Sequence, residues 1–343
     1  MALPVDAALS DLQKAAHLRA REGRLAERLA AVQGALKDDL GWVEQALASA
    51  VESGPRPATD AARHLVSLGG KRVRPLALLL SAACFGPVPP AARELAVVAE
   101  LVHSATLLHD DVVDEGTERR GAPTSRRLWG NAMSVLSGDL LLIHALERTL
   151  IHAPDSMTDL VSTLRRLVEG EIVQLRGRTE LDVSEVTYEQ VLRDKTASLF
   201  GWATRTGARL AGASEHHQDQ MASFGERLGM AFQLVDDVLD YAAEHSGKTL
   251  LSDLREGKLT LPLVLSVAER PELFEPLAKV HAGDPAPVAL ISRAVIEGGA
   301  CDEVRKRARR QTEYAVDALR TLPVSRARDL LEEVAFKLAE RAS

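Results

Sequence analysis

The same acidic pattern, DDxxD, occurs twice in this chain, each time after an apolar stretch with helical spacing. The two copies are Asp110, Asp111 and Asp114, called the first claw, and Asp236, Asp237 and Asp240, called the second claw. On a helix of about 3.6 residues per turn, the outer aspartates of each copy lie on one face, with the middle one close beside them. Carboxylates gathered at the C-terminal end of a buried helix repel one another and oppose the helix dipole, so each claw predicts a bound cation.

The composition of the claws favours magnesium. Neither claw contains the Cys or His ligands that are typical of zinc sites. Mg²⁺ prefers oxygen ligands, keeps several waters and commonly bridges carboxylates to substrate phosphates. One such pattern alone is typical of a solvated acidic surface. Its repetition after two apolar helices indicates a functional site that acts on a phosphorylated substrate.

The pattern of the whole chain predicts an all-α fold. Helical periodicity is interrupted mainly by Gly and Pro, for example at Gly54-Pro55, Gly69-Gly70 and Pro262. Aromatic residues make up only 3% of the chain, while Ala and Leu are abundant, which favours helices over strands. The long predicted helices cover residues 90–114, 125–152, 156–180, 185–212 and 218–241.

No convincing linker divides the 343 residues. We therefore predict a single all-helical domain over residues 1–343. Within it, residues 1–35 form a helical N-terminal extension, which either lies on the body or a partner or is a solvated arm. The motifs lie in a core of about residues 60–270.

Charge and cysteine content exclude several classes of protein. The net charge of −7 and the pI near 5.9 argue against nucleic-acid binding, which requires an extended basic surface. Cys84 and Cys301 lie far apart without CxxC spacing, so we expect free core thiols in a reducing compartment. The N-terminus lacks the apolar segment of a signal peptide, and no apolar run reaches about 18 residues. The expectation is a cytoplasmic protein without stable membrane insertion.

Three groups of basic residues are candidates for binding a diphosphate. The first is GGKRVRP, residues 69–75, in which glycines allow close backbone approach and Lys and Arg supply donors. The second is the pair Arg119-Arg120, a few residues after the first claw. The third is Lys195, Lys248 and Lys258. Each group taken alone is also compatible with an ordinary basic surface.

These residues stand in a series of motifs that resembles a known family. In order, the motifs are GGKRVRP, ELVHSATLLHDDVVDEGTERRG, VLSGDLL, EGEIVQL, DKTASLF, FQLVDDVLDY and GKTLLSDLREGKLTLP. Together they resemble the trans-polyprenyl diphosphate synthases, also called trans-isoprenyl diphosphate synthases, over about residues 60 to 270. The resemblance implies an all-α, isoprenoid-synthase-type helical bundle around a deep central active-site cavity, and a homodimer.

The resemblance also implies roles for individual residues. The head group of isopentenyl diphosphate would be bound by Lys71, Arg74, His103 and Arg120. The allylic diphosphate would be bound by Arg119, Lys195, Thr196, Gln233, Lys248 and Lys258. The six claw aspartates would hold about three Mg²⁺ ions and, with Arg119 and Lys195, form the expected catalytic set.

The implied reaction is an ionisation followed by a condensation. Mg²⁺ and basic side chains draw charge onto the leaving diphosphate, so the allylic C–O bond breaks to a resonance-stabilised cation. The double bond of isopentenyl diphosphate attacks this cation, and loss of a proton, with released diphosphate as base, gives a longer trans product. No side-chain nucleophile is needed, which agrees with the lack of a recognisable Ser/His/Asp or Cys/His arrangement.

Two small residues before the first claw bear on product length. Ala105 and Thr106 lie about one helical turn before Asp110, and in the family bulky aromatic residues here accompany short products. The resemblance therefore implies a long-chain enzyme, such as a hexa- to decaprenyl diphosphate synthase with products of about C30 to C50. Candidates for the tunnel floor are the apolar residues Leu101, Val102, Leu142 and Leu146, which are equally compatible with plain core packing.

Several alternatives remain open from the sequence. The chain is also compatible with a short-chain synthase making about C15 to C20, or with a noncatalytic partner subunit of a heteromeric prenyl synthase. Such subunits tend to have degraded claws, whereas every Asp of both claws is present here. A class I terpenoid cyclase would lack GGKRVRP, and a dimetal-carboxylate bundle would need Glu and ExxH ligands from several helices.

Overall fold

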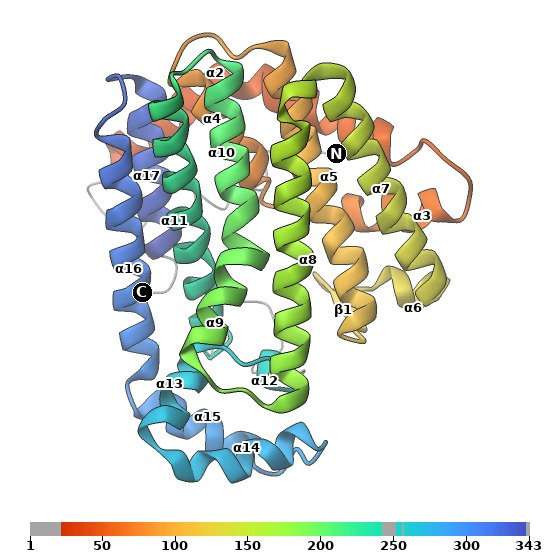
Figure 1. Cartoon of the computed structure of the whole chain (residues 1–343), viewed down its shortest axis with the longest axis vertical. Helices are drawn as coiled ribbons and strands as arrows, with labels where there is room; N and C mark the ends of the chain where they lie inside the picture. Colours follow the sequence, from red (N-terminus) through yellow and green to blue (C-terminus); the bar gives the residue numbers. More distant parts are fainter. Residues whose placement is uncertain (1–21, 242–251, 256, 341–343) are drawn as a thin grey trace. The chain divides into compact units, whose positions relative to one another are not determined.

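The computed structural model describes residues 22–241, 252–255 and 257–340. In these residues the fold is helical, apart from one pair of two-residue strands (Figure 1). The predicted all-α class is therefore confirmed. The chain divides into two compact units, which are described separately: unit 1 is Met1–Leu160, Ala203–Met221 and Leu322–Glu333, and unit 2 is Val161–Trp202, Ala222–Thr321 and Val334–Ser343. The expectation of a single domain stays a prediction.

The elements within unit 1 are, in chain order, α2 (Glu22–Ala50), α3 (Ala58–Ser67), α4 (Val73–Ala83), α5 (Pro90–Val113), β1 (Glu118–Arg119), β2 (Ala122–Pro123), α6 (Ser125–Trp129), α7 (Asn131–His152) and η1 (Pro154–Ser156). Those within unit 2 are α9 (Glu185–Val191), the π-helical turn η2 (Leu192–Ala197), α12 (Ser252–Arg255), α13 (Leu261–Glu269), η3 (Pro271–Leu273), α14 (Phe274–His281), α15 (Val288–Glu297) and α16 (Ala300–Leu319). Four helices contain residues of both units: α8 (Met157–Glu180), α10 (Ser198–Leu210), α11 (Glu215–Leu239) and α17 (Arg326–Glu340).

Helix α5 is the centre of unit 1 and carries the first claw at its end. Pro90 occupies its first position, where the missing N–H costs no hydrogen bond, and the extended Pro89 precedes it. Most of its apolar side chains are buried, and the helix packs against α2, α4 and α7. Ser134 on α7 donates to the carbonyl of Leu108 at 2.8 Å. Because α5 is packed on several sides, the backbone that carries the aspartates at its C-terminal end is held rigidly.

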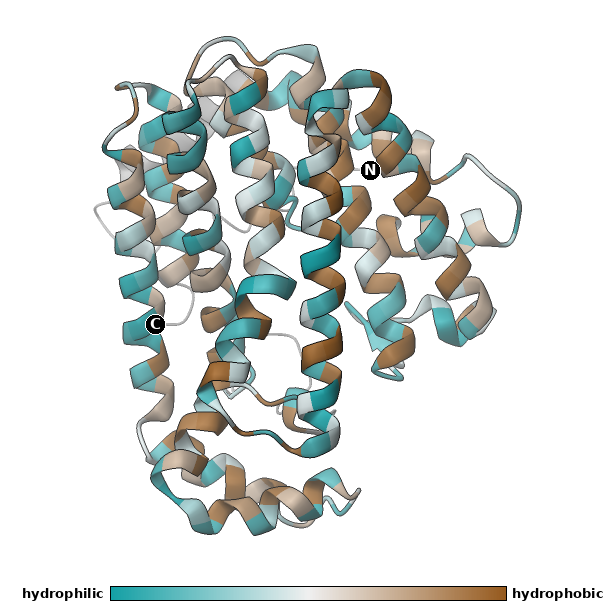
Figure 2. Ribbon diagram, in the orientation of Figure 1, coloured by the Kyte–Doolittle hydropathy of each residue, from teal (hydrophilic) through white to brown (hydrophobic). Residues whose placement is uncertain are grey.

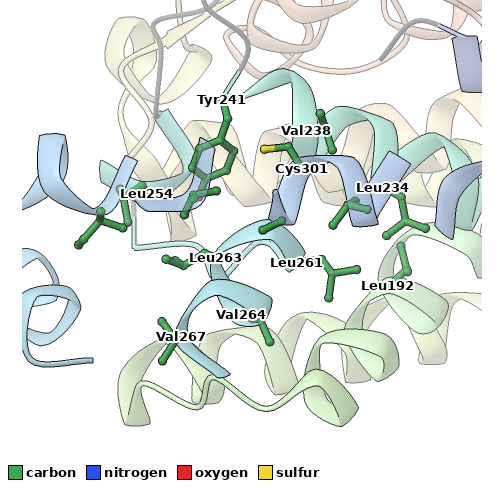
Figure 3. Packing of buried hydrophobic residues seen from close by; sticks show 14 of the residues in the cluster. Leu192, Leu234, Val238, Tyr241, Leu254, Leu261, Leu263, Val264, Val267 and Cys301 are labelled. Carbon is green, nitrogen blue, oxygen red and sulfur yellow. The ribbon is translucent and has the colours of Figure 1, made fainter. Parts of the chain in front are cut away.

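Helix α11 carries the second claw, and the core of unit 2 holds its end in place. The cluster in Figure 3 joins Leu234, Val238 and Tyr241, at the end of α11, to residues of η2, α12, α13 and α16. Cys301 on α16 is buried in the same cluster. Cys301 and Cys84, in unit 1, are free thiols, so the expectation that both are core residues is confirmed. No helix within the described ranges is long and apolar enough to cross a membrane.

Most predicted helices appear with small shifts in their ends, but three differ. The helix predicted over 125–152 is interrupted at Gly130, whose φ of 82° belongs to the left-handed region. The helix predicted over 185–212 contains the π-helical turn at 192–197. The predicted extension over 1–35 is described only from Glu22, where α2 begins, and this helix continues to Ala50. Residues 1–21 lie outside the described part of the chain.

Candidate functional site

The first claw places one aspartate inside the protein and two near its surface. Asp110 and Asp114 are half-buried, while Asp111 is only 3% exposed. The Oδ1 atom of Asp111 accepts hydrogen bonds from Nε and Nη2 of Arg119 at 2.9 and 2.7 Å. Its Oδ2 atom is also buried, and no partner for it is found among the described residues. An orphaned carboxylate oxygen in an acidic cluster fits the coordination of a cation.

A tight β-hairpin brings Arg119 to Asp111. Arg119 pairs with Ala122 across β1 and β2, and the two loop residues, Arg120 and Gly121, have φ of 54° and 76°. Positive φ at both positions is typical of a type I′ turn, which matches the twist of the strands. Both arginines were predicted from the sequence, but the hairpin was not. The Arg-Gly dipeptide before Ala-Pro was its only local signal.

The glycine-rich segment before α4 gathers basic side chains. Arg72, the N-cap residue of α4, has a left-handed backbone with φ of 47°, and its side chain is buried. It donates from Nε to Glu44 on α2 at 2.7 Å and from Nη1 to Glu100 on α5 at 2.5 Å. Lys71 is exposed, while Arg74 is half-buried. Sequence reasoning proposed Lys71 and Arg74 and gave no role to Arg72, Glu44 or Glu100.

Electrostatics indicate that Arg74, His103 and Arg120 belong to one basic site. Burial lowers the pKa of Arg74 to about 10, against the opposing charge of Glu100. Burial also lowers the pKa of Arg120. The pKa of His103 lies well below its usual value, first because of burial and then because of the charges of Arg74 and Arg120. His103 is therefore neutral at physiological pH, and it can accept or donate a hydrogen bond without adding charge.

The lowered pKa of His103 predicts an acid-side loss of stability. Below the ordinary histidine pKa of 6.5, the unfolded chain binds a proton at this residue that the folded protein resists. The free energy of unfolding therefore decreases as the pH falls below that value, by up to about 1.4 kcal/mol per pH unit. We expect His103→Gln to remove this part of the slope in urea unfolding between about pH 7.5 and about pH 5.5. The exposed His216→Gln is the control, and equal slopes in wild type and His103→Gln would contradict the prediction.

The second claw is organised around Asp237. This carboxylate is 3% exposed and accepts three hydrogen bonds: from Nε2 of Gln233 at 2.9 Å, from the hydroxyl of Tyr188 at 2.7 Å and from the backbone N–H of Leu261 at 3.1 Å. Burial raises its pKa to about 6, and these hydrogen bonds oppose the shift. Tyr188 on α9 was not singled out from the sequence, since nothing local indicates that it reaches α11. Asp237 therefore ties α9, α11 and α13 together.

The outer residues of the second claw lie beside the segment that carries Lys258. Asp236 is half-buried, while Asp240 is buried just past the end of α11, and its Oδ2 accepts the backbone N–H of Asp253 at 3.3 Å. Lys258 forms an ion pair with Asp253 at 3.8 Å. Through Asp253, the structure thus places Lys258 near Asp240 of the second claw. Lys248 lies outside the described residues.

Lys195 and Thr196 lie on the π-helical turn η2. The Nζ of Lys195 donates to Oε1 of Gln174 at 2.7 Å and forms an ion pair with Glu171, both from α8. Thr196 donates to Gln233 at 3.3 Å, which connects it to Asp237. A Cβ at Gly170 would lie 2.7 Å from the backbone N of Lys195, so only glycine allows this approach. Irregular π turns are frequent at functional sites, and helical periodicity does not reveal them.

The predicted site residues thus form local groups within each unit. In unit 1 Asp111 meets Arg119, and Arg74 and Arg120 act on His103. In unit 2 Thr196, Gln233 and Asp237 form one hydrogen-bonded chain. Within the described residues, no group of three or more Asp, Glu, His or Cys side chains is arranged to hold a metal by itself. Mg²⁺ sites commonly use one or two carboxylates together with waters and substrate phosphates.

Comparison with known proteins identifies the family. The profile of the polyprenyl synthetase family matches residues 56–296, which include both claws and GGKRVRP. The chain belongs to the polyprenyl synthetase family. It is 35% identical to heptaprenyl diphosphate synthase component 2 of Geobacillus stearothermophilus, over 92% of this chain and 99% of that protein. It is 36% identical to the all-trans-nonaprenyl-diphosphate synthase (geranyl-diphosphate specific) of Rhodobacter capsulatus, over 85% of this chain and 92% of that protein.

A solved structure of a polyprenyl synthase has the same fold as this chain. The polyprenyl synthase of Caulobacter crescentus CB15, complexed with calcium and isoprenyl diphosphate, superposes with a TM-score of 0.85 at 33% identity, covering 91% of this chain and 97% of that one. The predicted isoprenoid-synthase fold is confirmed. As a polyprenyl synthetase family member, the protein is a trans-prenyltransferase that elongates prenyl diphosphates, as the motifs predicted. The family generally uses Mg²⁺.

Proposed function

We propose that this family member is a long-chain trans-polyprenyl diphosphate synthase that condenses isopentenyl diphosphate with an allylic diphosphate such as geranyl or farnesyl diphosphate. The observation that carries the proposal is Asp111, one oxygen of which is held by Arg119 while the other is buried without a partner among the described residues. A carboxylate prepared in this way fits a divalent cation that in turn binds a diphosphate. Bound Mg²⁺ would stabilise the negative charge that develops on the leaving diphosphate.

The basic residues of unit 1 would bind isopentenyl diphosphate. We assign its head group to Lys71, Arg74, His103 and Arg120. Arg74 and Arg120 bring positive charge to the neutral imidazole of His103. Arginine suits this role because its planar donors bind phosphate oxygens in pairs. Held by its head group, the substrate presents its double bond at a fixed place, which lowers the entropic part of the barrier.

The allylic diphosphate is assigned to a second set of residues. These are Arg119, Lys195, Thr196, Gln233 and Lys258, with Lys248 outside the described residues. Arg119 and Lys195 would stabilise the charge of the leaving diphosphate as the allylic C–O bond breaks. The six claw aspartates would hold the Mg²⁺ ions, about three in all. The released diphosphate would accept the proton that ends each condensation.

The wall near the first claw supports a long product. Ala105 is fully buried and small, and Thr106 is half-buried with its hydroxyl bonded to the carbonyl of His103 at 2.8 Å. Neither side chain is bulky enough to block a growing prenyl chain. Of the proposed floor residues, Leu101 and Val102 are fully buried, whereas Leu142 and Leu146 on α7 are half-buried. A short-chain synthase is the alternative on the same site.

We propose that the protein acts as a homodimer and that α7 contributes to the interface. Leu136, Ile143 and Leu150 are 52, 50 and 62% exposed and recur every seven residues, so they share one face of the helix. Figure 2 shows hydrophobic segments recurring along α7 between more hydrophilic ones. Beside this face lies a mostly apolar groove of about 330 Å³, lined by residues 55–58 and by Leu136, Leu140 and Ile143. An exposed apolar stripe next to an apolar groove is typical of an interaction surface.

A double substitution that adds charge to this surface tests the dimer. The variant Leu136→Glu/Ile143→Glu is expected to convert a dimer into a folded monomer, because buried carboxylates without partners oppose association. Light scattering after size-exclusion chromatography measures the mass. Phe274→Glu, an exposed apolar position on α14, is the control. A wild-type monomer, or a double variant that stays dimeric, would contradict this assignment.

Product analysis tests the function itself. Purified protein is incubated with Mg²⁺, labelled isopentenyl diphosphate and farnesyl diphosphate, and the products are separated by length. A ladder that ends at about C30 or longer is expected, since Ala105 and Thr106 leave the wall open. A stop at about C20 would support the short-chain alternative. Absence of elongation with any allylic primer would favour a noncatalytic partner subunit of a heteromeric prenyl synthase. We place the activity in the cytoplasm because Cys84 and Cys301 are free thiols.

A further inference from the structure

A buried carboxylate lies among the arginines of the basic site. Glu100 on α5 is 3% exposed and accepts a hydrogen bond from Nη1 of Arg72 at 2.5 Å. Its charge also acts on Arg74 and Arg120, in each case favouring the charged guanidinium against the cost of burial. Three arginines that repel one another thus share one buried anion. None of the roles assigned above uses Glu100.

Arg72 connects this carboxylate to a second one. Its guanidinium is held between Glu100 on α5 and Glu44 on α2, while its backbone caps α4 in a left-handed conformation. A non-glycine residue keeps such a backbone only where its surroundings impose it. The two ion pairs supply that constraint. Lys71 immediately precedes Arg72, and Arg74 follows it by two residues, so both lie in the same short segment at the start of α4. The directions in which the side chains of Lys71 and Arg74 point therefore depend on how the side chain of Arg72 is held.

Gly70 shows how closely these groups approach. A Cβ at Gly70 would lie 2.9 Å from Nη1 of Arg72, 3.4 Å from Oε1 of Glu100 and 3.5 Å from Nη1 of Arg120. The tip of the β-hairpin, the start of α4 and the middle of α5 therefore meet at this glycine. His103 lies three residues after Glu100 on α5, on the same side of the helix.

We propose that Glu100, through Arg72 and with the support of Glu44, is a positioning residue that holds the arginines of the isopentenyl diphosphate pocket in place before substrate binds. The proposal rests on the proposed function, which assigns Lys71, Arg74, His103 and Arg120 to that pocket. Glu100 itself does not touch the substrate. It offsets the mutual repulsion of the arginines, so the pocket exists in its binding geometry in the absence of the diphosphate.

The charge of Glu100 makes the test decisive. If this carboxylate only opposed an incoming anion, its neutralisation in Glu100→Gln would strengthen binding and lower the KM for isopentenyl diphosphate. If it positions the arginines, the same change lets them separate, and that KM rises. We expect a rise of about tenfold with the KM for the allylic diphosphate changed less than about twofold, because the loss is confined to one substrate.

Two further variants keep the test independent of folding. Glu44→Gln loosens Arg72 from the other side and leaves Glu100 intact, so it is expected to raise the same KM by about threefold. Glu100→Asp keeps the charge on a shorter side chain, and a KM between those of wild type and Glu100→Gln is expected. The matched control is Asp39→Asn. It breaks another ion pair between α2 and α5, that of Asp39 with Arg93, which lies outside the basic cluster.

The outcomes separate this inference from the proposed function. If Arg74→Gln and Lys71→Gln leave the KM for isopentenyl diphosphate unchanged, the pocket itself is assigned wrongly. If those variants raise this KM while folded Glu100→Gln and Glu44→Gln leave it unchanged or lower it, the positioning role is overturned and the pocket stands. An equal rise in Asp39→Asn would also overturn the role, since it would reduce the effect to a general loss of α2–α5 packing.

Discussion

Replacing Asp111 by Asn is expected to lower kcat by about a thousandfold while the protein stays folded. The Oδ2 atom of Asp111 is buried without a partner among the described residues, and this oxygen is the one prepared for a cation. Asn keeps an oxygen that accepts from Arg119 but removes the negative charge that a metal–diphosphate complex needs nearby. Because Arg119 is 28% exposed in its side chain, solvent compensates part of its lost ion pair, and the stability loss stays at about 1 kcal/mol.

The measurement is incorporation of labelled isopentenyl diphosphate at saturating Mg²⁺ and both substrates, beside thermal unfolding of the same sample. Asp219→Asn is the matched control: it neutralises an aspartate of unit 1 whose side chain is 59% exposed and which is paired with Arg205 away from the claw. A folded Asp111→Asn variant within tenfold of wild-type kcat would overturn the assignment of Asp111. An unfolded variant would instead show that the Asp111–Arg119 pair is mainly structural, and Arg119→Gln would then unfold as well.

The claws were predictable because their chemistry is local. Three acidic residues within five positions at the end of an apolar helix conflict with helix electrostatics, and such a conflict is visible in a single sequence. The helices themselves followed from periodicity, and α5 and α11 end within two residues of the expected positions. Gln233 could be named only through the family motifs, since it is by itself an ordinary polar residue. Lys195 and Lys258 were candidates from their charge alone, but only the motifs distinguished them from an ordinary basic surface.

The partners that hold these residues in place were not predictable. Tyr188 is 49 residues from Asp237, and Glu44 and Glu100 are each 28 residues from Arg72. Such pairings depend on tertiary packing, and no local pattern encodes them. The hairpin of Arg120 and the π turn of Lys195 were missed for a different reason: each is an exception to regular geometry that a few residues produce. In both claws the middle aspartate is buried: Asp111 is bound by Arg119, eight residues away, and Asp237 by the distant Tyr188 together with Gln233.

Thr106→Phe is expected to shorten the product to about C15 to C20 without a large loss of stability. The two small residues near the first claw differ in their surroundings: Ala105 is 0% exposed in the core of unit 1, whereas Thr106 is half-buried. A phenyl ring at Ala105 would overpack the core at a cost of about 1–3 kcal/mol. Thr106 is only half-buried, so a ring there is less confined, and it replaces a hydroxyl that bonds to the carbonyl of its own helix. A substitution at Thr106 can therefore block the growing prenyl chain without damaging the core, whereas a substitution at Ala105 would do both.

Product length is measured by mass spectrometry after elongation of geranyl diphosphate by wild type, Thr106→Phe and Thr106→Val. Valine has nearly the same shape as threonine and lacks the hydroxyl, so it controls for the lost hydrogen bond, and its product length should equal that of wild type. Short products from both variants would mean that the Thr106 hydroxyl, and not its volume, sets the length. Wild-type products from a folded Thr106→Phe variant would show that the chain grows along another wall. In that case the smallness of Ala105 and Thr106 would reflect helix packing, and the long-chain assignment would lose its structural support.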